Sequence, residues 1–199
     1  MRTIELLKFR ASLVLCLLVA CLVWPACSVN VRKEANGEDK QVDIKTPLGG
    51  LHVSKGADVR DTGLPVYPGA RLKPGDSEDH DKSANVNLSA FGFGLQVVAL
   101  EYESDDAPAK LISYYEDQLK KYGKVLQCHS TSKLDLNVKI DKDNDHDSDE
   151  LTCNGNTGSH IELKVGTRDN QHIVAVEPEG KGSNFSLVYV RTHGKQADI

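Results

Sequence analysis

Three of the five cysteines lie near the N-terminus, and their surroundings indicate what chemistry they could undergo. Cys16, Cys21 and Cys27 fall within or next to the apolar run ASLVLCLLVACLV at residues 11–23, which follows the basic segment MRTIELLKFR. A basic segment followed by about 7–15 apolar residues is typical of an export signal. A membrane-spanning helix needs roughly 18–20 apolar residues, more than this run contains. We therefore expect residues 1–26 to form a signal peptide; a retained signal anchor is the alternative.

The way this signal is cut decides the chemistry of Cys27. Ordinary signal peptidase prefers small residues at −3 and −1, and the sequence WPA before Cys27 puts Trp24 at −3. A lipoprotein signal, cut just before a cysteine whose thiol is then diacylglycerated, fits better. Cys21 has the better preceding sequence, LVA, but cutting there leaves an apolar CLVWPAC start, whereas Cys27 precedes the polar SVNVRKEANGEDK. We predict that Cys27 is acylated, with Cys21 as the alternative.

Cys128 and Cys153 are the two cysteines of the expected folded region. They predict one disulfide, because export takes the chain into an oxidising compartment. Closing a loop of about 25 residues would stabilise the fold by about 3 kcal/mol. Two buried reduced thiols are the alternative. A zinc site fits less well, because two thiolates without a CxxC or paired histidines supply half of a structural site.

The run DKDNDHDSDE at residues 141–150 carries alternating carboxylates, as calcium-binding loops do. An EF-hand loop needs glycine at its sixth position and glutamate at its twelfth, and here these positions hold His146 and Thr152. We expect an acidic hairpin tip, with a weak calcium site as the alternative. The candidate metal ligands are Asp141, Asp143, Asp145, Asp147 and Asp149.

No sequence pattern typical of an enzyme site is evident. Asp105 and Asp106 are adjacent carboxylates at the expected start of a helix, where capping explains them better than acid–base catalysis. The histidines lack metal-binding spacing, and we expect most of them at the surface or at strand ends. We therefore assign no catalytic residue and no cofactor. The histidines are His52, His80, His129, His146, His160, His172 and His193.

Composition limits the classes of partner. Hydrophobic residues make up 39% of the chain and charged residues 27%, as in ordinary globular proteins. The formal net charge is −5, and the signal region adds +2, which leaves about −7 for the mature part. This balance argues against nucleic acid as a partner. It also provides no basic surface for anionic lipids, so any membrane attachment must come from the N-terminal lipid.

One amphipathic helix is expected in APAKLISYYEDQLKKYG, over about residues 107–122. Proline stands in its first turn, Gly123 follows its end, and lysines occupy its last turn. The apolar residues recur at helical spacing and would pack on one face of a sheet. They are Leu111, Ile112, Tyr115, Leu119 and Tyr122.

The remaining apolar segments alternate with polar residues, as strands do. LQVVALEYES is the strongest and should be central in its sheet, and Asn36-Gly37 predicts a hairpin. Tyr67-Pro68-Gly69-Ala70 has the proline and glycine of a type II turn. The later strands, the last four as a meander with short loops, are KVLQCHS, LDLNVKI, ELTCN, HIELKVGT, HIVAVEP and FSLVYVRT.

The expected fold class is α+β, a mainly antiparallel curved sheet with the helix on one face and a small N-terminal β-hairpin extension. At 199 residues the chain suits one domain with a core. The expected divisions are a signal at 1–26, the hairpin extension and linker at 27–60, the α+β domain at 61–194 and a tail at 195–199.

Several segments together resemble a family of uncharacterised bacterial envelope lipoproteins with a Y-P-G-A turn before a strand and an S/D-rich cap before an F/Y-Y helix. The resemblance covers most of residues 27–194 and implies the location and the fold. It makes Cys27 the natural first mature residue and implies no activity. The segments are CSVNVRKE, VDIKTPLGGLHV, LPVYPGA, YESDDAPAKLISYYEDQLKKYGKVL, ELTC, ELKVGT and FSLVYVRTHG.

Three functional hypotheses follow. The first is a non-enzymatic envelope lipoprotein, periplasm-facing or in the outer membrane, that binds an envelope protein, a glycan or an apolar ligand. The second is a metal-binding role through residues 141–150. The third is a hydrolase whose site forms only in three dimensions.

Overall fold

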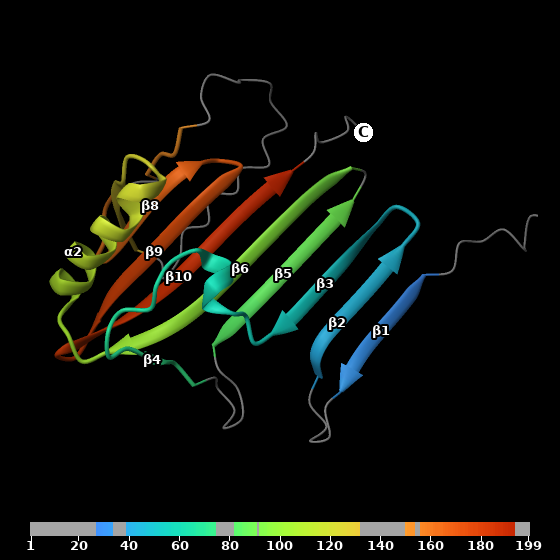
Figure 1. Ribbon diagram of the computed structural model, residues 1–199, viewed down its shortest axis with the longest axis horizontal. Coiled ribbons are helices and arrows are strands. Elements are labelled where there is room, and N and C mark those ends of the chain that lie inside the picture. Colours follow the sequence, from blue (N-terminus) through green and yellow to red (C-terminus); the bar gives the residue numbers. More distant parts are fainter. Residues whose placement is uncertain are drawn as a thin grey trace, which may run out of the picture.

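A computed structural model describes residues 27–33, 39–74, 82–90, 92–131, 150–153 and 156–193. Its main feature is one open antiparallel sheet, in which the strands lie in the order β1-β2-β3-β5-β6-β10-β9-β8-β7 and the short β4 pairs with β6 (Figure 1). The strands are β1 (Ser28–Lys33), β2 (Asp39–Thr46), β3 (Gly49–Lys55), β4 (Arg71–Leu72), β5 (Ser83–Ala90), β6 (Phe93–Ser104), β7 (Leu126–Ser130), β8 (His160–Thr167), β9 (Asn170–Glu179) and β10 (Gly182–His193).

The two longest strands, β6 and β10, pair in the middle of this sheet. The run of branched residues in β6 packs well between two neighbours, which is why a segment of this composition takes a central position. Successive side chains of a strand point to opposite faces, so Val98 and Leu100 face the main core while Val97 and Ala99 face away from it. The predicted central position of LQVVALEYES is confirmed.

One α-helix, α2 (Pro108–Leu119), lies across β8 and β9 and continues into the 3₁₀ turn η2 (Lys120–Tyr122) (Figure 1). Leu111, Tyr115 and Leu119 are fully buried against the sheet. Residues spaced by three or four lie on the same side of a helix, which is why this set forms the contact. The predicted helix and its apolar face are confirmed, although 37% of Tyr122 stays exposed.

The start of α2 differs from the prediction. The N-cap residue is Ala107, which makes no side-chain capping bond, and Asp106 precedes it. The Asp106 carboxylate instead accepts hydrogen bonds from Lys110 Nζ at 2.6 Å and from the Tyr67 hydroxyl at 2.9 Å. Asp105 accepts two bonds from the guanidinium of Arg71. Capping by Asp105 or Asp106 was therefore wrong, because side chains distant in sequence engage both carboxylates.

A segment before β4 closes the end of the core. It contains the 3₁₀ turn η1 (Val59–Thr62), which contacts β6 and β10. The predicted turn at residues 67–70 is confirmed: the Ala70 N–H donates to the Tyr67 carbonyl at 3.0 Å. Gly69 has a φ of +78°, which side chains rarely adopt and which a type II turn requires.

The α+β class is confirmed, with β1, β2 and β3 continuing the same sheet rather than standing apart from it. The meander of β8, β9 and β10 is confirmed. ELTC is not a strand, which is a correction to the prediction. LDLNVKI, the Asn36-Gly37 turn and the signal peptide lie outside the described residues. Within the described part of the chain, no helix has the length and hydropathy of a membrane span.

Candidate functional site

The sheet surface turned away from α2 carries rows of apolar side chains that cross several strands. The register aligns one valine from each of six neighbouring strands, from β1 to β10: Val31, Val42, Val53, Val86, Val97 and Val190. A second row lies beside it: Val29, Ile44, Leu51, Leu88 and Leu95. We call these two rows the apolar face. Directly paired side chains contact one another across strands, so each row is continuous.

Exposure on the apolar face is greatest at the β1 edge, where 64% of Val29 is exposed. Val190 is fully buried, Val97 is half-buried, and 41% of Val31 is exposed. In the second row, 38% of Leu88 is exposed. An exposed apolar patch of this extent on a sheet is typical of a contact surface.

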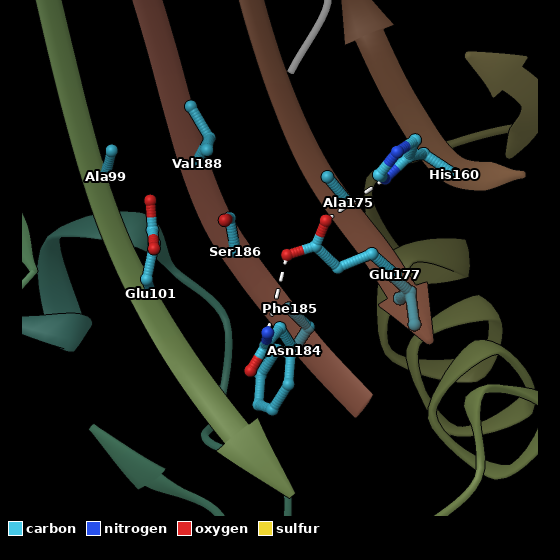
Figure 2. A pocket seen from close by; sticks show the side chains of 10 residues that line it. Ala99, Glu101, His160, Ala175, Glu177, Asn184, Phe185, Ser186 and Val188 are labelled. Atoms are coloured by element: carbon cyan, nitrogen blue, oxygen red, sulfur yellow. Dashed lines mark hydrogen bonds and ion pairs between the residues drawn. The ribbon is translucent and has the colours of Figure 1, made fainter. Parts of the chain in front are cut away.

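A pocket lies next to the apolar face, on the same side of β6, β8, β9 and β10 (Figure 2). Ala99, Ala175 and Val188 supply its apolar wall. Its polar lining includes Glu101, His160, Glu177, Asn184 and Ser186.

Glu177 connects two of these polar residues. Its Oε2 lies 3.2 Å from His160 Nδ1, and its Oε1 accepts a hydrogen bond from Asn184 Nδ2 at 3.4 Å. Asn184 Nδ2 also donates to Glu179 at 3.0 Å. His160 and Glu177 are only 20% and 19% exposed, so this contact is partly shielded from water. Figure 2 shows Glu177 between the other two side chains.

A second ion pair lies on the same face of β8. Lys164 Nζ is 2.8 Å from Glu162 Oε2, and the two side chains are 2% and 1% exposed. Period-two alternation places His160, Glu162 and Lys164 on one face of β8. Such burial is rare for Lys and Glu unless they are paired.

Ser186 and His160 of the pocket are not placed to form a serine–histidine pair. A serine hydrolase needs its serine within hydrogen-bond reach of the base. Ser186 is on β10 and pairs with Ala175 of β9, which pairs with Glu162 of β8. The strand that carries Ser186 is therefore two strands from the one that carries His160, roughly 10 Å away. Figure 2 shows Ala175 and Glu177 between them.

The predicted disulfide between Cys128 and Cys153 is confirmed. Their Cα atoms are 5.4 Å apart, within the range that a bridge requires. Cys128 is buried on β7, and Cys153 is the last residue of the described stretch 150–153. The bridge joins this stretch to the edge strand of the sheet, which fits a structural role.

The predicted acylation site, Cys27, is exposed and has a free thiol. The next residue, Ser28, begins β1, the end strand in the sheet order. The alternative site, Cys21, lies outside the described residues.

The candidate calcium ligands between residues 141 and 149 also lie outside the described residues. Where the chain is described, no group of three or more His, Cys, Asp or Glu side chains is placed to hold a metal ion.

His172 departs from the predicted surface or strand-end position, whereas His129, His160 and His193 lie at or next to strand ends. His172 is buried, with Nδ1 2.8 Å from the Thr62 carbonyl and the ring stacked on Tyr122 at a centroid distance of 3.8 Å. His52 Nδ1 lies 2.6 Å from Asp43. His129 and His193 are half-buried and exposed, as expected. His80 and His146 are not in the described ranges.

Comparisons with protein-family models, with curated proteins and with solved structures found no match.

Sequence reasoning missed the polar residues of β8 and their partner Glu177. A signal was present, because HIELKV alternates polar and apolar residues, and this alternation assigns His160, Glu162 and Lys164 to one face. Alternation predicts that this polar face is in water. It cannot reveal that this face is buried in the folded protein.

Proposed function

We propose that this protein is a non-catalytic binding module of the bacterial envelope, anchored by a lipid on Cys27, and that the apolar face contacts an apolar group of its partner. The observation that carries the proposal is the register of the apolar face. One row aligns apolar side chains from six strands and the other from five, and both rows are most exposed at the β1 edge.

The position of Cys27 supports the anchored arrangement. It is exposed and precedes β1 directly, so an acyl group there would not disturb the core. A diacylglyceryl group would attach the domain through the edge of the sheet that bears the exposed part of the apolar face. A partner in or near the membrane could then reach that face.

The pocket supports a binding role as well. His160 and Asn184 are held in place by contacts to Glu177, and Ala99 and Val188 are part of the apolar wall. An apolar wall with a few positioned polar groups is the chemistry of a ligand site, and at about 80 Å³ this pocket has room for one small polar group rather than a whole ligand. It would accept the polar end of a group that lies along the apolar face.

The proposal is tested by photo-crosslinking in the native envelope. A photoreactive amino acid replaces Leu88 in the full chain, and a matched variant carries it at Ser89. Both positions are exposed and adjacent on β5, but they point to opposite faces. The variant at Leu88 should crosslink to a discrete lipid or protein species, identified by mass spectrometry, and the variant at Ser89 should not. Equal crosslinking from both positions, or none from Leu88, would contradict the proposal.

A further inference from the structure

The exposed apolar side chains are concentrated at one corner of the sheet. Among the described residues, the two most exposed large hydrophobic side chains are Val29, at 64%, and Leu48, at 62%. Val29 is on β1, and Leu48 is in the hairpin that joins β2 to β3. Val31, at 41%, follows on β1.

The register brings this corner to Cys27. Ser28 is paired with Lys45 near the end of β2, so Cys27 is level with Thr46, where the hairpin begins. Figure 1 shows β1 starting beside the β2–β3 hairpin at the outer edge of the sheet. We call Cys27, Val29 and Leu48 the anchor corner.

The hairpin that presents Leu48 is held by its own hydrogen bonds. The Thr46 hydroxyl donates to the Gly49 carbonyl at 2.9 Å and accepts from the Leu48 N–H at 3.3 Å. Gly49 lies directly against the Ser89 carbonyl, too close for a Cβ, which ties the hairpin to β5. Leu48 is therefore presented outward by a structured turn.

We propose that the anchor corner is a membrane-contact tip: Leu48 and Val29 enter the interfacial region of the bilayer beside the acyl chains on Cys27. This inference rests on the proposed acylation of Cys27. No spacer separates Cys27 from β1, and one extended residue spans at most about 3.6 Å. Acyl chains on Cys27 therefore place the corner next to lipid. Acyl chains inserted in a bilayer would hold the corner at its surface.

The chemistry of the corner fits a lipid surface. Lys45, whose backbone pairs with Ser28, is exposed and can lie near lipid phosphates. Transfer of one leucine side chain from water into an apolar environment changes a partition equilibrium by about tenfold or more. The corner would thus fix the orientation of the domain as well as strengthen its attachment.

The test places an environment-sensitive fluorophore at the corner of the full chain in its native membranes. In the Leu48→Cys variant, the acyl group blocks the thiol of Cys27, and the disulfide blocks those of Cys128 and Cys153. The fluorophore therefore labels the new thiol at position 48. The matched control is Ser113→Cys, at an exposed position of α2. The label at residue 48 should show blue-shifted emission and quenching by spin-labelled phosphatidylcholine, and the label at residue 113 should show neither.

Lipid labelling of Cys27, measured in parallel, separates the two proposals. Acylated Cys27 with a water-like, unquenched signal at residue 48 overturns the membrane-contact tip and leaves the proposed anchoring intact. Equal quenching at residues 48 and 113 also overturns the tip, because it shows no preferred orientation. A chain that carries no lipid and is recovered in the soluble fraction overturns both proposals.

Discussion

Glu162 and Lys164 lie two residues apart on β8 and form a 2.8 Å ion pair whose side chains are 1% and 2% exposed. Removing one member of such a pair takes a close partner from a buried charge, which is strongly destabilising. We expect Lys164→Met to lower the free energy of unfolding by about 3–5 kcal/mol. The double variant Lys164→Met with Glu162→Leu should recover most of this loss. Urea denaturation measures both, and a double variant as unstable as the single one would show that the pair is not the cause.

Tyr115 joins α2 to the segment before β4. Its hydroxyl donates to the Pro65 carbonyl at 3.2 Å and accepts from the Tyr67 N–H at 3.0 Å, and burial raises the pKa of Tyr115. Tyr115→Phe should therefore cost about 1–3 kcal/mol of unfolding free energy, because it leaves these backbone groups unpaired. Tyr114→Phe is the matched control, since no hydrogen bond of its hydroxyl is found in the described part of the chain. Equal effects of the two substitutions in urea denaturation would refute this role for Tyr115.

His172 makes stability depend on pH. Burial of the imidazole lowers its pKa, although the hydrogen bond to Thr62 opposes this effect. Since a carbonyl only accepts, Nδ1 carries the proton and donates to it. As pH falls below about 6.5, the unfolded chain takes up a proton before the folded one does. The stabilisation that neutral His172 gives above that pH is therefore lost progressively as the pH falls toward the lowered pKa of His172.

His172→Phe tests this pH dependence. Phenylalanine can keep the stacking on Tyr122 and Tyr189, but it leaves the Thr62 carbonyl without its donor. We expect a loss of about 1 kcal/mol at pH 7.5. We also expect a flatter decrease of unfolding free energy between pH 7 and pH 5, measured by urea denaturation at each pH. An unchanged slope would assign the pH dependence to other groups.

The disulfide should contribute stability and no redox activity. Cys128→Ala with Cys153→Ala should lower the unfolding free energy by about 3 kcal/mol, because the unfolded chain loses the constraint of its closed loop. Reduction of the wild-type protein should have the same effect, whereas reduction of the double variant should have none. Thermal or urea unfolding with and without reductant measures this. A wild-type protein insensitive to complete reduction would contradict the stabilising role.

Local patterns predicted the elements well, for a physical reason. The helical spacing of Leu111, Tyr115 and Leu119 and the alternation in β6 are determined by residues close in sequence. The start of α2 was shifted by one residue, because the side chains that engage Asp106 include Tyr67, which is 39 positions away. No local rule contains that contact.

The candidate site could not be predicted from the sequence, because it depends on the order of the strands in the sheet. The alternation of apolar and polar residues within a strand does not specify that order. The valine row exists because β3 pairs with β5 and β6 pairs with β10, and these pairings join segments far apart in the chain. VNV, VDI and LHV each indicated an apolar side of a short strand. Only the assembled sheet shows that these sides coincide and that His160 and Glu177 meet beside them.

The acylation state of Cys27 tests the account most directly, because both the proposed function and the membrane-contact tip depend on it. The native protein, extracted from the envelope and measured by intact mass spectrometry, should begin at Cys27 and carry a diacylglyceryl group. Labelling with a radioactive fatty acid should disappear in Cys27→Ser, and the uncut precursor should accumulate. A mature chain that begins elsewhere without lipid, or labelling that persists in Cys27→Ser and disappears only in Cys21→Ser, would contradict the account.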